Sequence, residues 1–233
     1  MKHRPLSSER IRRLLINEAP PSEWETKSAE KLIDLIDSEL RNIFEVLVQD
    51  PASAHAVALR SHFHVNGFAK IVLLRSSNRQ IRLHVWPNSR PRPDGDIHDH
   101  RWPFTSLPLV GSFEENRYLI SDEGLTTNQH ICHPRAGKTW IRLSGYQSIA
   151  LKQCVHAIRS KAATYYCEAG EIHQFTPLGT STAATLVVAG RSLPSHARVF
   201  SERPRTSGTL LLPSPYLTGE KLIDLVRELS AEM

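Results

Sequence analysis

The chain has 233 residues, of which 40% are hydrophobic, enough for one sizeable core with a small additional unit. Its formal charge of +5 is scattered along the sequence, with only a small cluster at Arg10, Arg12 and Arg13. A nucleic-acid footprint usually needs a concentrated basic stripe with aromatic residues, so we expect no nucleic-acid partner.

Cysteine usage and the N-terminal residues indicate the compartment. The three cysteines, Cys132, Cys154 and Cys167, form no CxxC pair, which suits a reducing environment better than a disulfide framework. No apolar run is long enough for a membrane span, and the first residues lack the apolar segment of a signal peptide. We therefore expect a cytoplasmic protein that has no membrane partner.

The N-terminal part is predicted to be helical. Ser7 or Ser8 can cap a short helix that ends at the prolines of positions 20–21. A stronger helix is predicted over about 29–48, because its leucines and isoleucines recur at helical spacing, and Pro51 is expected to end it.

The middle of the chain predicts an all-β barrel or sandwich. Short runs rich in β-branched and aromatic residues alternate with turn residues, with no helix between them. The predicted strands lie near 68–75, 80–86, 97–100, 104–110, 112–120, 126–132, 138–143, 147–154, 163–168, 171–176 and 183–190.

The C-terminal part begins with a stretch rich in Pro, Ser and Arg, from Ser192 to Pro215, which we expect to lie as a loop across the surface. Thr218 then caps an amphipathic helix. The resulting organisation is a helical extension over 1–60 that packs on the barrel, a barrel over 61–200, and a surface loop with a C-terminal helix over 201–233. The terminal helices are expected to cover the barrel or the interface of a homodimer.

Three histidines have suggestive settings. His98 and His100 lie two residues apart in G-D-I-H-D-H-R-W-P-F, and residues i and i+2 of a strand point to the same face. His173 follows the turn residue Gly170 in E-A-G-E-I-H-Q-F. A strand pair that brings His173 opposite the other two would complete a three-nitrogen metal site with open positions, as a catalytic metal needs.

These segments resemble the two motifs of the cupin superfamily, roughly G…H-x-H…E…G and P-x-G…H…N. His98, His100 and Gly111 match the first motif, and Gly170 and His173 match the second. The resemblance implies a cupin fold, a double-stranded β-helix or jelly-roll barrel, here with N-terminal helices and a C-terminal helix.

Two positions depart from these motifs. Phe104 or Thr105 stands where cupins often carry a metal-binding glutamate, and Glu168 replaces the proline before the motif glycine. The resemblance therefore implies a ligand set of three neutral histidines without a carboxylate.

Within the superfamily, that ligand set looks most like the thiol dioxygenases, of which cysteine dioxygenase is the best-known member. These enzymes also place helices before the barrel and carry I-H-D-H, then an apolar strand ending in glycine, then an acidic strand. Three positions depart: Lys70 falls where that family holds the substrate carboxylate with an arginine, Thr105 where some members have a crosslinked cysteine, and Ala189 near the late-strand tyrosine. Cysteine itself is thus a doubtful substrate.

The predicted function is that of a mononuclear Fe(II) oxygenase that uses O2 on a small polar, amino-acid-like or thiol metabolite. Three histidines add no charge, so a bound divalent ion keeps its full charge and favours an anionic substrate. Lys70, Arg82 or Arg101 is expected to hold the substrate carboxylate.

Further pocket candidates are His84, which lies on a predicted inner strand, and Tyr166. For both, packing is the favoured role, and a place in the pocket is the alternative. Asp99 alternates away from its histidine neighbours and is expected to face outward or support a loop, and of Glu114 and Glu115 one is expected to face inward.

Other functions stay open from sequence alone. Imidazole ligands suit Zn, Ni and Cu as well as Fe, and Mn is a further alternative. The site could therefore serve an isomerase, a lyase or a biosynthetic tailoring enzyme that forms a bond by oxidising a nitrogen-bearing metabolite. A non-catalytic cupin that binds a small molecule is the remaining alternative, because fold does not fix function.

Overall fold

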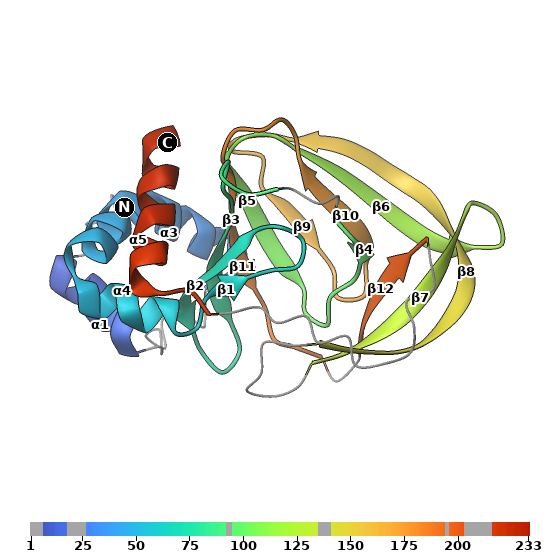
Figure 1. Cartoon of the computed structure of the whole chain (residues 1–233), viewed down its shortest axis with the longest axis horizontal. Helices are drawn as coiled ribbons and strands as arrows, with labels where there is room; N and C mark the ends of the chain where they lie inside the picture. Colours follow the sequence, from blue (N-terminus) through green and yellow to red (C-terminus); the bar gives the residue numbers. More distant parts are fainter. Residues whose placement is uncertain (1–6, 18–26, 92–94, 135–140, 194–195, 203–215) are drawn as a thin grey trace.

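The structure is a computed structural model that describes residues 7–17, 27–91, 95–134, 141–193, 196–202 and 216–233. Helices gather at one end of the molecule and long strands extend to the other (Figure 1). The helices are α1 (Ser8–Asn17), α3 (Ala29–Gln49), α4 (Pro51–Ala58) and α5 (Gly219–Glu232). Within the described residues, no helix is both long and apolar enough to cross a membrane.

The helix boundaries follow the predicted caps. The Ser7 Oγ accepts from the backbone N–H of Arg10, and the Thr218 side chain accepts from that of Lys221. Pro51 ends α3 as predicted, but it also opens α4, which the sequence analysis missed. A proline at the first position of a helix costs no hydrogen bond, so the same residue can both stop one helix and start the next.

The strands form an open sheet and a closed barrel. The open sheet has the order β1-β2-β3-β11-β5-β9, and the closed barrel the order β10-β4-β12-β7-β8-β6, with antiparallel pairing throughout. Their bounds are β1 (His62–Phe63), β2 (Ala69–Arg75), β3 (Gln80–Trp86), β4 (Ile97–His98), β5 (Phe104–Val110), β6 (Phe113–Ser121), β7 (Leu125–Pro134), β8 (Ile141–Arg159), β9 (Tyr165–Cys167), β10 (Ile172–Pro177), β11 (Ala183–Ala189) and β12 (Ala197–Ser201).

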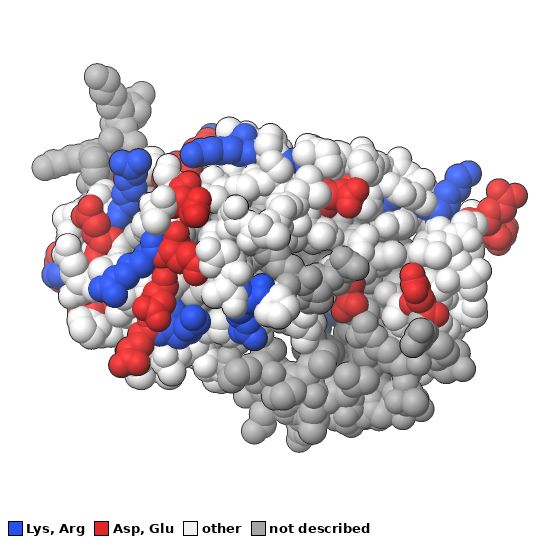
Figure 2. All heavy atoms as spheres, turned by 45° about the horizontal axis from the view of Figure 1, so that its top comes forward, with Lys and Arg blue, Asp and Glu red and all other residues white. Residues whose placement is uncertain are grey.

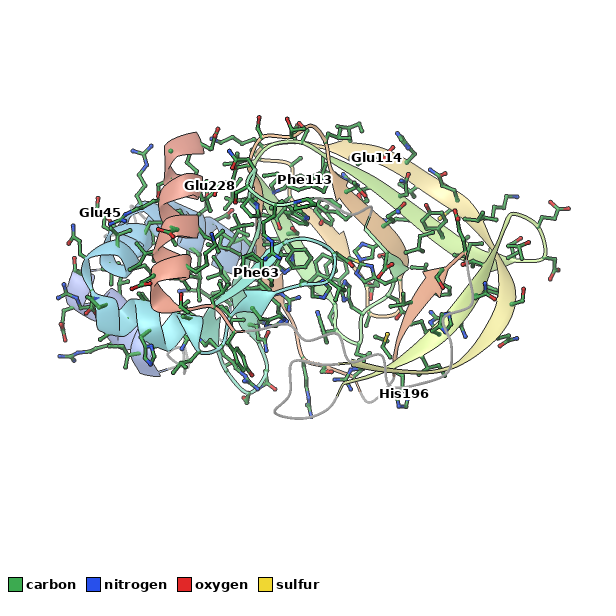
Figure 3. The ribbon with its side chains drawn as sticks, in the orientation of Figure 1. Glu45, Phe63, Phe113, Glu114, His196 and Glu228 are labelled. Atoms are coloured by element: carbon green, nitrogen blue, oxygen red, sulfur yellow. The ribbon has the colours of Figure 1, made fainter. Side chains whose placement is uncertain are left out.

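The two faces of the open sheet have different neighbours. One face, which includes Ile81, Leu83 and Val85 of β3, shares the largest apolar core with the four helices. The other face packs against the closed barrel, where Trp86 of β3 contacts the ring of Phe113 of β6 at 5.3 Å between centroids. Figure 3 shows Phe113 among the strands, well apart from Glu45 on the helices. Polar side chains on the second face therefore lie towards the closed barrel, and Arg82 among them is buried.

Two strand predictions were wrong. The strands expected near 138–143 and 147–154 belong to one long strand, β8, in the range that the structure describes from 141 onward. The stretch expected as a surface loop contains β12, which forms because A-R-V-F-S pairs with both β4 and β7. The sequence did not indicate this strand because it is short and flanked by loop-forming residues. Residues 203–215 of that stretch lie outside the described residues.

The predicted fold class is confirmed: the protein is mainly β, with a jelly-roll barrel of the cupin type flanked by N-terminal helices and a C-terminal helix. Acidic and basic side chains are interspersed over the helical end, and no broad patch of one sign covers the face shown in Figure 2.

Candidate metal centre

His98, His100 and His173 converge on one point. One ring nitrogen from each lies within 4.8 Å of the others, and the Nε2 atoms of His100 and His173 are 3.2 Å apart. His173 is buried, and the other two are half-buried. The predicted grouping of these three side chains is therefore what the structure shows.

Strand pairing produces this convergence. His98 on β4 lies directly opposite His173 on β10, and directly opposite residues of an antiparallel pair share one face of the sheet. β4 ends at His98, so His100 lies just beyond the strand, where the backbone N–H of Gly170 donates to its carbonyl at 2.8 Å. Gly170 has a φ of +81°, a conformation that favours glycine and turns the chain into β10.

Asp99 holds the H-D-H segment in place. Its carboxylate is buried and accepts from Nε of Arg198 at 2.5 Å and from the backbone N–H of Arg198 at 2.6 Å. The guanidinium of Arg198 also donates to the carbonyl of Gly170 at 3.2 Å. Arg198 thus connects the two histidine-bearing segments. Of the two roles predicted for Asp99, facing outward is wrong because the side chain is buried, whereas supporting the loop is what its hydrogen bonds show.

The three histidines have the protonation state that a metal needs. Burial lowers the pKa of all three imidazoles, with neighbouring histidines adding to the effect at His100 and His173. Nδ1 of His98 lies 2.7 Å from the carbonyl of Asp96, and because a carbonyl only accepts, this nitrogen carries the proton. Nε2 of His98 is then left with its lone pair for a metal.

The spacing of two of the three nitrogens also fits a metal ion. Two nitrogens that bind the same ion at about 2.1 Å are roughly 3.0 to 3.4 Å apart, depending on the nitrogen–metal–nitrogen angle. The 3.2 Å between His100 and His173 lies within that range. Three protein nitrogens leave further positions open, as in catalytic rather than structural sites.

Aromatic side chains enclose the triad. The Trp102 ring stacks on His100 at 5.4 Å between centroids, and Phe104 meets His100 edge-on at 5.3 Å and His173 at 5.7 Å. The thiol of Cys167 lies 4.0 Å from Nδ1 of His173, and burial raises the pKa of this thiol, which keeps it protonated. The rings of Trp102 and Phe104 therefore form an aromatic wall on one side of the triad.

Two predicted site residues, Lys70 and His84, lie together on the barrel-facing side of the open sheet. They are directly opposite each other on β2 and β3. Burial and the charge of Arg82 lower the pKa of Lys70 to about 7, and burial lowers the pKa of His84 well below its ordinary value. Their roles toward a substrate stay predictions.

The other two predicted site residues are placed differently. Arg101 is half-buried and its carbonyl accepts from Leu193 N–H at 2.7 Å. On β9, Tyr165 and Cys167 are buried whereas Tyr166 between them is 47% exposed, so the structure does not bring Tyr166 to the triad. Tyr165, which meets Phe104 edge-on at 6.1 Å, is the tyrosine on the inner face.

Sequence reasoning missed the charged network beside His173. Arg117 lies opposite His173 and donates to the fully buried Glu115 at 2.8 Å, and Arg159 donates to the other oxygen of Glu115 at 2.6 Å. Of the acidic pair, Glu115 is indeed the inward residue and Glu114 is half-buried. The alternation of β6 gave a signal for Glu115, but nothing in the sequence marked its partners.

No protein-family model matches the chain, and neither does any curated protein. Solved structures do show a likeness. A protein with a double-stranded β-helix domain from Klebsiella pneumoniae subsp. pneumoniae MGH 78578 is 11% identical, with 60% of this chain and 84% of that chain covered and a TM-score of 0.34. A cupin superfamily protein from Desulfitobacterium hafniense DCB-2 is 13% identical, with 59% and 87% covered and a TM-score of 0.30.

Some of the structures found are enzymes. Hydroquinone 1,2-dioxygenase from Sphingomonas sp. TTNP3 is 9% identical, with 53% of this chain and 65% of that chain covered and a TM-score of 0.33. The neighbours include cupin-superfamily proteins, but likenesses this weak carry no argument about the reaction. The architecture stated above follows from the strand pairing, and the case for a metal follows from the histidines.

Proposed function

We propose that the protein is a mononuclear Fe(II) oxygenase of the cytoplasm that acts on a small polar, amino-acid-like or thiol metabolite with O2. The observation that carries the proposal is the convergence of His98, His100 and His173, each buried or half-buried and neutral, within 4.8 Å. No described carboxylate joins this cluster, which is the ligand set of the thiol dioxygenases that the sequence resembles.

Bound iron would supply the redox chemistry and the open positions for substrate and O2. The histidines would hold it, with His98 oriented by the Asp96 carbonyl. Trp102 and Phe104 exclude water from one side of the triad, which strengthens electrostatic attraction for a charged substrate. Lys70 and Arg82 would hold an acidic group of that substrate.

The test is the metal content of protein purified without a histidine tag. We expect near-stoichiometric iron in the wild type and its loss in His98→Ala/His173→Ala. The control is His55→Ala/His196→Ala, which changes two exposed histidines and should keep the metal. Oxygen uptake with a panel of thiols and amino acids would then be screened in all three proteins.

The outcomes separate the candidate reactions. Iron that is lost only in the triad variant, together with substrate-dependent oxygen uptake, supports the oxygenase. Zinc or nickel lost in the same pattern would keep the site but overturn the oxidation in favour of an isomerase or lyase. If the wild-type protein binds no metal even after reconstitution, the three histidines are packing residues and the proposal fails.

A further inference from the structure

A row of basic side chains crosses the barrel-facing side of the open sheet. Lys70 of β2 is directly opposite His62 of β1 on one side and His84 of β3 on the other. Directly opposite residues point to the same face, with their Cβ atoms about 5 Å apart. Arg82 lies two residues before His84 and therefore on that same face, diagonal to Lys70.

Two of these side chains have unmet hydrogen-bonding capacity. Arg82 is only 3% exposed, and its Nε has no hydrogen-bond partner within the described structure. The same holds for Nε2 of His84. A buried polar group without a partner is unfavourable, and native proteins keep such groups mainly where a ligand or water completes them.

The row is also uncompensated in charge. Within the described residues, no carboxylate forms an ion pair with Lys70 or Arg82. The charged groups that act on Lys70 are Arg82 and Arg75, and both are cations. On the closed barrel, by contrast, the buried carboxylates Glu115 and Asp99 each bind an arginine. A buried cation without an anion is the costlier arrangement, and a bound anion removes that cost.

The row is next to the triad. The guanidinium carbon of Arg82 lies 5.5 Å from the ring centroid of Trp102, which in turn stacks on His100 at 5.4 Å. An anion held by the row would therefore place the rest of a small molecule beside the three histidines.

We propose that Lys70, Arg82 and His84 bind a substrate group that carries two negative charges, of the phosphate or dicarboxylate type. A single carboxylate would neutralise Arg82 and leave Lys70 uncompensated, whereas a doubly charged group satisfies both cations and can accept from His84. The anion-binding property stands on the open sheet alone. Its identification as a substrate group rests on the proposed function of the neighbouring triad.

Protonation agrees with this assignment. With a pKa of about 7 in the free protein, Lys70 is only partly charged near neutral pH. A dianion beside it would raise that pKa, so binding should take up a proton at pH 8. The groups that face Lys70 are Arg82, Arg75, His62, His64 and His84. Burial holds the pKa of His62 at about 4 and the pKa values of His64 and His84 well below the ordinary value, so all three histidines stay neutral there.

The experiment is isothermal titration of the full chain with inorganic phosphate, sulfate, malonate and acetate in an amine buffer. His98→Ala/His173→Ala is titrated as well, so that chelation by a metal plays no part. We expect both proteins to bind phosphate or malonate at least tenfold more tightly than acetate. If phosphate is the tighter of the two, the substrate group is of the phosphate type, and if malonate is tighter, it is of the dicarboxylate type. Lys70→Met/Arg82→Met should weaken binding at least tenfold.

Lys152→Met/Arg227→Met, which removes two exposed cations, should leave binding unchanged. Arg82→Lys, which keeps the charge, should retain part of the affinity even if the double variant does not fold, and circular dichroism checks each fold. Acetate bound as tightly as malonate and phosphate, or no anion bound, overturns the proposal. Anion binding that persists while the metal test fails would separate this inference from the oxygenase.

Discussion

The open sheet and the closed barrel accommodate buried charge in opposite ways. On the closed barrel, the carboxylates of Glu115 and Asp99 are buried and accept hydrogen bonds from arginines at 2.5 to 2.8 Å. On the open sheet, Arg82 is buried and Lys70 is half-buried, with no carboxylate among the described residues to match them. Removing one partner of a buried ion pair is strongly destabilising, whereas a buried charge that has no partner already costs stability and is typical of a binding site.

The largest effect is expected at Arg198. Arg198→Ala leaves the Asp99 carboxylate buried with only a backbone N–H, which we expect to lower the free energy of unfolding by about 3 kcal/mol. Because Arg198 also holds Gly170, metal affinity should fall roughly tenfold to 100-fold. Urea denaturation and metal titration measure the two effects.

Arg191→Ala, which changes an exposed arginine near the same strand, is the control and should change neither quantity. Unchanged metal affinity in Arg198→Ala, with the stability loss intact, would show that Arg198 supports the fold but does not position the histidines.

A matched pair of substitutions tests the comparison itself. Arg117→Met removes a cation that donates to Glu115, Glu171 and the carbonyl of Tyr166, so we expect it to cost about 2 kcal/mol, with Arg159 still present on Glu115. Arg82→Met replaces an unpaired cation by an apolar side chain of similar length. It should change the free energy of unfolding by less than about 1 kcal/mol, or increase it. Equal losses from both variants in urea denaturation would contradict the contrast between the two sheets.

The last effect concerns pH and is spread over several pH units. The pKa of Lys70 is about 7 in the folded protein and 10.5 ordinarily, so the unfolded chain binds more protons between these values. Stability therefore rises with pH across that window, by at most about 1.4 kcal/mol per pH unit from this group. In Lys70→Met this contribution is absent. The free energy of unfolding of the variant should exceed that of the wild type by a constant amount below pH 7, and this difference should vanish towards pH 10.5.

Thermal unfolding of both proteins from pH 6 to pH 10, in a buffer without multivalent anions, gives the measurement. A constant difference across that range would mean that Lys70 titrates near its ordinary value and is less enclosed than the structure indicates.

The histidine cluster was predictable because each motif is local. H-x-H fixes two side chains within three residues, and the glycine before His173 indicates the turn that starts the next strand. The role of Arg198 was not predictable, because its strand is short and lies in a segment rich in Pro, Ser and Arg. Its partner Asp99 is far away in sequence, and only strand pairing brings the two together.

Strand phase and register account for the rest. Adjacent tyrosines at 165 and 166 point to opposite faces, and the sequence does not state which one points inward. Lys70 and His84 were each recognised as candidates, yet the row that they form depends on β2 and β3 pairing in a particular register. Likewise, the absence of a matching carboxylate is a property of three-dimensional neighbours rather than of any motif.

The pairing of His98 with His173 has a consequence for how the protein would be handled. The ligands come from segments that meet only when β4 and β10 are aligned, so an unfolded chain offers no equivalent site. By linkage, a metal that binds only the folded chain raises its stability by about 2.7 kcal/mol at a free concentration of 100 times Kd. Chelators in a purification buffer would therefore lower the melting temperature, and thermal shift with each divalent ion would rank their affinities without any knowledge of the substrate.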